Sequence, residues 1–266
     1  MPLVDYPVSF NGYTLSAVPG VSVLSANAYT PAKRGVKLSD IARTDKRAVK
    51  SAFFSNKQVT IGVAIKGASR AIMESSIDTL LSRLVGIEKE LIVNQSLTGA
   101  GVPTTRKYYA TMIDFVPKVS GGSFLQADIV FECSDSFGYE VTQTTALSIS
   151  GITASTRSDA VTFGGSAPWQ APVITVTYSS VTDGTAKELL IGNSAIGQQV
   201  AITADWASSD VLVIDSYNKT VKINGTDVAF SGAIPEWPPG SGNWSYSDNL
   251  MARNFAATIT YYKRFI

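Results

Sequence analysis

A run of alternating side chains that ends at the chain's one cysteine constrains the fold most. From residue 125 to residue 133, apolar side chains occupy every second position and mostly polar ones stand between them. This period of two is the pattern of a β-strand with one buried face. Beyond Tyr139 the sequence becomes small and polar, which is typical of a linker, so a β-rich domain is expected to end here. The positions expected to point inward are Leu125, Ala127, Ile129, Phe131 and Cys133.

The first domain, predicted over residues 1–140, also contains one helix pattern. Residues 58–66 alternate as a strand, after which the apolar period changes to that of a helix with Met73, Ile77, Leu80, Leu81 and Leu84 on one stripe. With Ser69 as N-cap and Gly86 just past the end, the pattern predicts a helix over about 70–85. A small sheet with one helix packed on it is an α+β unit, and its other strands are expected at 89–94, 106–116 and 124–133.

The second half of the chain, 151–266, contains strand patterns but no helix pattern, and it follows a linker expected at 141–150. Its strongest local signal is Asn224-Gly225, because both residues tolerate the positive φ angles of a tight hairpin turn. Short strands at roughly regular spacing predict a β-sandwich. They are expected at 172–178, 188–192, 198–203, 210–215, 220–224, 227–230 and 255–265. The last one either closes the sandwich or returns to the first domain.

The sequence offers little for catalysis. It contains no histidine, so it lacks the commonest general base near neutral pH and a usual zinc ligand. It also lacks a phosphate-binding loop and EF-hand spacing. Three carboxylates, Asp205, Asp210 and Asp215, are interpreted as solvated strand ends rather than a catalytic pair. We therefore expect no enzyme, no catalytic residue, no cofactor and no metal, with Cys133 as a small buried apolar residue.

The tryptophans raise a second possibility for the sandwich. All of them, Trp169, Trp206, Trp237 and Trp244, lie in the second domain. Exposed aromatic rings can stack on sugars, whereas buried rings close a core. Trp237 and Trp244 flank a turn rich in proline and glycine, so a core or interface role is the favoured interpretation. A carbohydrate-binding module that contributes to host-surface adhesion is the alternative.

Charge is scarce and unevenly placed. Charged residues make up 16% of the chain and the net charge is +1. The surface of a free small domain is usually more highly charged, so burial against other subunits is expected. Residues 31–50 are the exception, being basic with little periodicity, which indicates a long loop or arm that is solvated or contacts a neighbouring subunit. It lacks the interleaved aromatic residues of a single-strand binder. The candidate intersubunit residues are Arg34, Lys37, Arg43, Arg47, Phe53 and Phe54.

The order of these elements resembles the distal tail protein (Dit) family of long-tailed bacteriophages. The first domain closes on Phe131-Glu132-Cys133-Ser134-Asp135-Ser136-Phe137. This stretch is similar to the family's F-x-C-x-D-P-F/Y ending, with Ser136 in place of proline. Further stretches that resemble the family's C-terminal series lie at 211–215, 221–225, 232–240, 243–244 and 259–265.

The resemblance implies a homohexameric ring of first domains at the distal end of the tail, with a galectin-like β-sandwich on each subunit. The ring would join the major tail tube protein to the tail-tip or tail-fibre hub protein, and its channel would pass the tape measure protein and DNA. It implies a virion location at the tail tip, no membrane contact and no sequence-specific nucleic-acid binding. A baseplate or tail-tube component of another kind is a further alternative. Because residues 1–7 show no signal-peptide pattern, synthesis in the host cytoplasm is expected.

Overall fold

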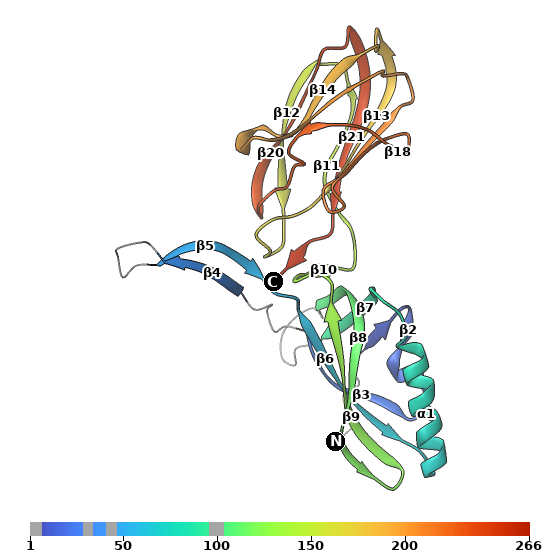
Figure 1. Cartoon of the computed structure of the whole chain (residues 1–266). Helices are drawn as coiled ribbons and strands as arrows, with labels where there is room; N and C mark the ends of the chain where they lie inside the picture. Colours follow the sequence, from blue (N-terminus) through green and yellow to red (C-terminus); the bar gives the residue numbers. More distant parts are fainter. Residues whose placement is uncertain (1–6, 29–33, 41–46, 96–103) are drawn as a thin grey trace. The chain divides into compact units, whose positions relative to one another are not determined.

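The structure is a computed structural model that describes residues 7–28, 34–40, 47–95 and 104–266. Two compact units make up the chain, Met1–Val141 with Ile266, and Thr142–Phe265. Antiparallel strands dominate both units, and one α-helix occurs among the described residues (Figure 1). The prediction of a mainly β chain is therefore confirmed.

The first unit is built around an antiparallel sheet with the strand order β2-β1-β7-β8-β9-β6-β3, and β10 pairs with β8. In β9, every second side chain from Leu125 to Cys133 is buried, as the alternation predicted. The elements are β1 (Val8–Phe10), β2 (Tyr13–Thr14), the 3-10 turn η1 (Leu15–Ala17), β3 (Val21–Asn27), β6 (Gln58–Lys66), β7 (Lys89–Gln95), β8 (Thr104–Gly121), β9 (Phe124–Cys133) and β10 (Gly138–Glu140).

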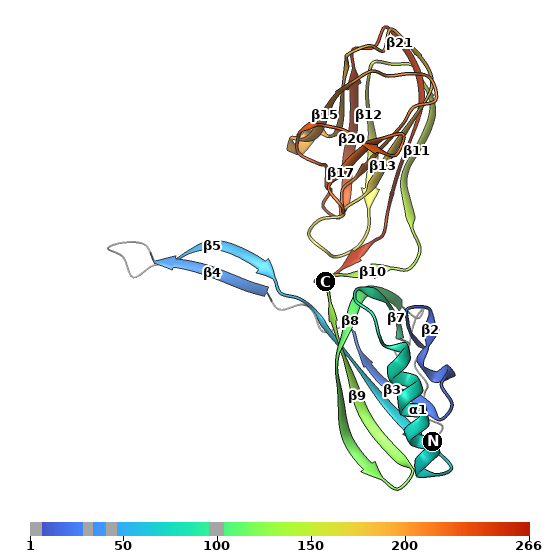
Figure 2. The same cartoon turned by 45° about the vertical axis from the view of Figure 1, so that its right-hand side comes forward.

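Helix α1 (Arg70–Arg83) covers one face of this sheet (Figure 2). The Ser69 side chain accepts a hydrogen bond from the Ile72 amide at 3.3 Å, so the predicted N-cap is confirmed. The predicted apolar stripe packs as expected. Met73, Leu80 and Leu84 are buried, and the other two stripe residues are partly buried against the same core. The helix thereby encloses the inward face of β6 and β9.

The basic segment is not a loop where the structure describes it. Strands β4 (Arg34–Asp40) and β5 (Arg47–Phe54) pair antiparallel in a sheet of their own, with a register shift between Lys37 and Leu38. The expectation of a loop was wrong because it relied on apolar alternation. Alternation marks a strand that buries one face on a core, whereas the backbone hydrogen bonds of a ladder do not require it. We call this pair the arm ribbon.

The second unit is a sandwich of two antiparallel sheets, β11-β21-β13-β16-β17-β18 and β12-β20-β14-β15-β19. Side chains of both sheets share one core, and the rings of Tyr246 and Phe255, one from each sheet, lie 4.3 Å apart. The strands are β11 (Thr144–Ile152), β12 (Thr156–Phe163), β13 (Val173–Thr182), β14 (Lys187–Asn193), β15 (Gln198–Ala204), β16 (Val211–Asp215), β17 (Thr220–Ile223), β18 (Thr226–Asp227), β19 (Ser231–Gly232), β20 (Gly240–Asp248) and β21 (Ala252–Tyr261). The unit also includes β22 (Arg264–Phe265), which belongs to neither of these two sheets.

Several strands of the sandwich differ from the expectation. Of the strand expected at 227–230, only Asp227 lies in a strand, β18, and the next strand, β19, begins at Ser231. The segment expected to be a linker, 141–150, contains most of β11, an outer strand paired only with β21 in its sheet. Strands β12 and β20 were not predicted either. The first half of β12, Thr156–Asp159, is polar throughout, and in β20 glycine and serine surround the two aromatic residues. The Asn224-Gly225 hairpin is confirmed, with φ angles of 51° and 80°. The last long strand, β21, lies within the sandwich between β11 and β13.

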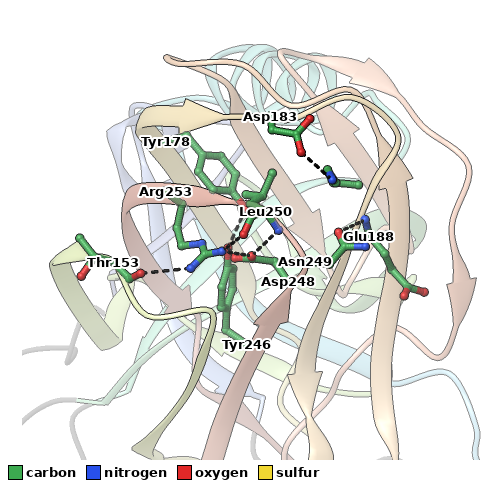
Figure 3. Close-up of polar contacts among 10 residues, drawn as sticks. Thr153, Tyr178, Asp183, Glu188, Tyr246, Asp248, Asn249, Leu250 and Arg253 are labelled. Carbon is green, nitrogen blue, oxygen red and sulfur yellow. Dashed lines mark hydrogen bonds and ion pairs between the residues drawn. The ribbon is translucent and has the colours of Figure 1, made fainter.

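A buried polar network secures the turn between β20 and β21 (Figure 3). Arg253 and Asp248 form an ion pair at 2.9 Å, with side chains only 7% and 1% exposed. The Tyr246 hydroxyl donates to Asp248 and lies 2.9 Å from the hydroxyl of Tyr178. Arg253 also donates to the carbonyl of Thr153 at 3.2 Å. Burial raises the pKa of both tyrosines, so they stay neutral hydrogen-bonding groups.

We predict that Leu80→Ala lowers the free energy of unfolding of the first unit by about 2–5 kcal/mol, because Leu80 is fully buried against the sheet. Ile72→Ala is the matched control on the same helix; its side chain is 52% exposed, and its effect should stay within about 0.5 kcal/mol. Urea unfolding followed by far-ultraviolet circular dichroism measures both. Equal effects would contradict the assignment of the buried stripe.

We predict that Arg253→Met destabilises the second unit by about 3–5 kcal/mol, because it leaves the Asp248 carboxylate buried without its cation. The double variant Arg253→Met with Asp248→Asn should recover part of the loss, since the remaining group is neutral. All tryptophans lie in this unit, so their fluorescence during urea unfolding reports it. A double variant less stable than the single variant would contradict the role of the ion pair.

Candidate assembly surface

The arm ribbon carries five of the six predicted contact residues. Arg34 and Lys37 lie on β4, and Arg47, Phe53 and Phe54 lie on β5. The register sets Arg34 opposite Phe54, and Arg47 opposite Asp40 at the other end of the ladder. The sixth residue, Arg43, lies outside the described residues. The fold therefore gathers the described five on one two-stranded element.

The arm ribbon is incomplete as a folding unit. Neither β4 nor β5 pairs with any other strand in the described parts of the chain. An isolated two-stranded ribbon is at best marginally stable in water. The position of the arm ribbon on the first unit therefore depends on the contacts at its two ends.

One tyrosine of β8 contacts the chain on both sides of the arm ribbon. The hydroxyl of Tyr108 donates to the carbonyl of Ala28, the last described residue before β4, at 3.0 Å. The ammonium of Lys57, which follows β5, lies 5.0 Å from the centroid of the same ring. This is within the range of a cation–π interaction. Tyr108 is itself buried, so the rigid sheet fixes both contacts.

The motif that closes the first domain holds the exit of the arm ribbon. The amide of Cys133 donates to the carbonyl of Lys57 at 2.8 Å, and the Ser136 hydroxyl donates to the carbonyl of Ser55 at 2.9 Å. Between them, the side-chain amide of Asn56 donates to Glu132 at 3.0 Å. Proline has no hydroxyl, so the serine at position 136 supplies a bond that the family's usual residue lacks.

Burial dominates the electrostatics at this exit. Lys57 is 2% exposed, and burial lowers its pKa, with Cys133 acting in the opposite direction. Burial likewise raises the pKa of the Cys133 thiol to about 12; Lys57 opposes this rise, while Asp135 and Glu132 add to it. The thiol is therefore neutral near pH 7, as expected for a small buried apolar residue.

The ring of Tyr108 also depends on a glycine of β10. A Cβ atom at Gly138 would lie 2.8 Å from Cε1 of Tyr108 and 2.9 Å from its hydroxyl oxygen. Even alanine at this position would force the ring to shift. Gly138 therefore gives the Tyr108 side chain the space in which it reaches Ala28.

The face of the sheet opposite α1 carries a second exposed feature, an apolar stripe on β8 and β9. Its members are Val116, Val119 and Phe124, which are 39%, 54% and 37% exposed. The register places them along the outer face, with Val116 opposite Asp128. Asp128 pairs with Lys118 at 2.6 Å. We call these three residues the outer stripe.

No cluster of three or more His, Cys, Asp or Glu side chains among the described residues is placed to hold a metal ion. Asp205 and Asp215 accept hydrogen bonds from backbone amides of nearby turns, at 2.7 Å from Ala186 and 2.9 Å from Tyr217. No helix in the described parts of the chain is both long and apolar enough to cross a membrane.

Asp210 differs from the expectation of a solvated strand end. It is only 9% exposed, and it accepts hydrogen bonds from the Ala207 amide and the Asn224 side chain, each at 2.7 Å. The carboxylate is buried because it joins two turns that are distant in sequence.

The tryptophans mostly follow the favoured interpretation. Trp206, Trp237 and Trp244 are buried in the sandwich core, whereas Trp169 is 42% exposed.

Sequence reasoning did not identify Lys57, Tyr108 or Ala28 as part of this surface. The one signal in the sequence was Lys57, which directly precedes an apolar strand. A lysine at such a position is ordinarily expected to be solvated. Only the pairing of β6 with β9, and of β9 with β8, brings Lys57 next to Tyr108. That pairing joins residues far apart along the chain.

We predict that Tyr108→Phe destabilises the first unit by about 1–3 kcal/mol, because the buried carbonyl of Ala28 loses its donor. Hydrogen exchange at the Cys133 amide, which bonds Lys57, should become faster. Tyr13→Phe, the same change at a 48% exposed position, is the control and should alter neither quantity. An unchanged exchange rate in Tyr108→Phe would contradict the proposed anchoring.

Comparisons with known proteins place the fold. No protein-family model matches the chain and no curated protein matches its sequence. Among solved structures, the SPP1 Dit protein (gp 19.1), described as a paradigm of hub adsorption apparatus in phages that infect Gram-positive bacteria, matches with a TM-score of 0.75. The match covers 98% of this chain and 99% of the Dit chain at 14% identity.

A chain of the phage P2 baseplate in its activated conformation with Ca matches over 96% of this chain and 97% of its own. Its TM-score of 0.47, at 8% identity, is too low to support the fold by itself. The likeness to SPP1 Dit is high enough to establish the fold. It confirms, for the fold, the resemblance that the sequence motifs predicted: this chain has the distal tail protein fold.

Proposed function

We propose that this chain is a structural protein of a phage virion that forms a hexameric ring at the distal end of the tail. The observation that carries the proposal is the likeness to SPP1 Dit, which extends over nearly the whole of both chains. The order of the sequence motifs supports the same conclusion independently, because motifs from both halves occur in the family's order.

The ring is formed by the first units, and the arm ribbon of each subunit contacts the next. Two properties support this assignment. The arm ribbon has no other strand partner in the described chain, and a ribbon of this kind needs further contacts to be stable. Its ends are nevertheless fixed by Tyr108 and Ser136, so it is presented at a defined place on the first unit.

The outer stripe supplies a second contact in the ring. Exposed apolar side chains that gather on one face favour protein association. The partly buried Val130 lies on the same face of β9, and Asp128 pairs with Lys118 there. The low charge of the chain, 16%, is also typical of a protein whose surface is covered in an assembly.

The ring joins the major tail tube protein to the tail-tip hub protein, and its channel passes the tape measure protein and DNA. The protein acts without catalysis, at the tail tip of the virion. The second unit is a galectin-like sandwich that projects one copy from each subunit. These roles follow from the resemblance, and each requires only a ring with two binding faces.

The test is negative-stain electron microscopy of the purified chain, with native mass spectrometry of the same sample. Six-fold rings with an open centre, and the mass of six subunits, are the expected results. Monomers that persist at high protein concentration would contradict self-assembly. Rings of another order would contradict the hexamer and favour a different tail component.

We predict that Lys37→Glu with Arg47→Glu prevents ring formation, because the double change replaces one basic residue by an acidic one on each strand of the arm ribbon. At about 0.15 M salt only contacts at short range persist, so an effect would place the arm ribbon at the interface. Arg70→Glu with Lys89→Glu makes the same charge change at exposed positions of the first unit and should leave the rings intact. Rings in both variants would exclude the arm ribbon as a contact.

A further inference from the structure

A hollow opens in the sandwich where two strands separate. The ladder between β14 and β20 ends at the pair Gly192–Ser245. Beyond it, β14 turns into the 3-10 helix η2 (Ser194–Ile196), while β20 extends back to Gly240. The space between η2 and β20 is a hollow of about 430 Å³. This volume lies within the range of small-molecule sites, about 300–1,000 Å³.

The floor of the hollow contains a polar group without a partner. Asn193 lines it, is only 3% exposed, and holds its Oδ1 buried with no hydrogen bond. Asparagine directly before a helix usually caps it through its side chain, yet Asn193 makes no such bond to η2. A buried acceptor left unpaired is destabilising. The fold therefore retains an oxygen here that its own residues do not use.

The walls define the chemistry of what fits. None of the described residues that line the hollow is charged, so it offers no pairing group for a phosphate or a carboxylate. Ala160 and Ile196 form apolar walls beside the buried Trp237. Ser241 and Asn243 add polar groups from β20. An apolar lining with a few polar groups is the usual composition of a site that orients a small ligand.

We propose that this hollow binds a neutral pyranose ring of a cell-surface glycan. A neutral sugar presents an apolar C–H face, which suits Ala160 and Ile196. Its hydroxyl groups both donate and accept hydrogen bonds, as does the side-chain amide of Asn193. The polar groups of Ser241 and Asn243 lie where further hydroxyls would emerge. The site belongs to the second unit alone, so it does not depend on the proposed ring.

The probes are the methyl glycosides of glucose, galactose, N-acetylglucosamine and rhamnose, with methyl glucuronide as a charged comparison. Each is titrated into the full isotope-labelled chain, and the amide signals of residues 192–197 and the Asn193 side chain are followed by NMR. At least one neutral glycoside should shift these signals to saturation, with millimolar affinity, and methyl glucuronide should not. If none of the neutral glycosides shifts them, the proposal is wrong.

Two variants test the site. Asn193→Leu replaces the side chain with the unpaired Oδ1 by an apolar one of similar size. The variant should therefore fold normally and bind the sugar about tenfold or more weakly. Ala160→Phe should fill the hollow and prevent binding. Ser158→Phe, two residues earlier on the same exposed face of β12, is the matched control and should bind as the unchanged chain does. Binding that persists in both site variants would place the sugar elsewhere and overturn the proposal.

Discussion

The presentation of the arm ribbon depends on the side chain of Tyr108. Its hydroxyl bonds the carbonyl of Ala28 and its ring faces the ammonium of Lys57, so one buried residue joins the chain before β4 to the chain after β5. The two contacts differ in kind: one is a hydrogen bond to a neutral carbonyl, and the other brings a largely desolvated cation over an aromatic face. Neither stabilises β4 or β5 directly. They fix the ends of a ribbon whose pairing is local, and further stability must come from whatever the ribbon contacts.

The regular elements of the first unit were predictable because their apolar periodicity is a local property. In β6 and β9 the largest buried side chains stand at every second position, and in α1 the apolar side chains share one stripe. The arm ribbon was not predictable as strands, since residues 31–50 are basic and show little apolar periodicity. In the sandwich, β20 was missed for a different reason. Its inward residues Trp244 and Tyr246 are separated by serine and preceded by glycines, which together read as a turn.

The candidate surface likewise has features that the sequence predicts and features that only the structure reveals. The basic composition of residues 31–50 drew attention to the arm, and that property is visible in the sequence alone. The residues that hold it are visible only after β6, β9 and β8 are paired, because Lys57 and Tyr108 are distant in sequence and chemically ordinary. The closing motif of the first domain lies between these cases. The order of its residues was recognisable in the sequence. Its structural role was not, because the bonds from Cys133 and Ser136 to the exit of the arm ribbon are seen only in the structure.

The two units suggest two different kinds of binding: a small ligand in the second unit and another subunit in the first. In the sandwich, the buried ionic pair Asp248–Arg253 is surrounded by partners, including Tyr246 and Leu250, so its polarity serves the fold. The buried Oδ1 of Asn193, like the Nε of Arg253, has no hydrogen-bond partner. Asn193 differs from Arg253 because it lines the hollow beside η2. A ligand in that hollow would complete the hydrogen bonds of Asn193. In the first unit, the proposed ring would instead cover the arm ribbon and the outer stripe with another copy of the chain.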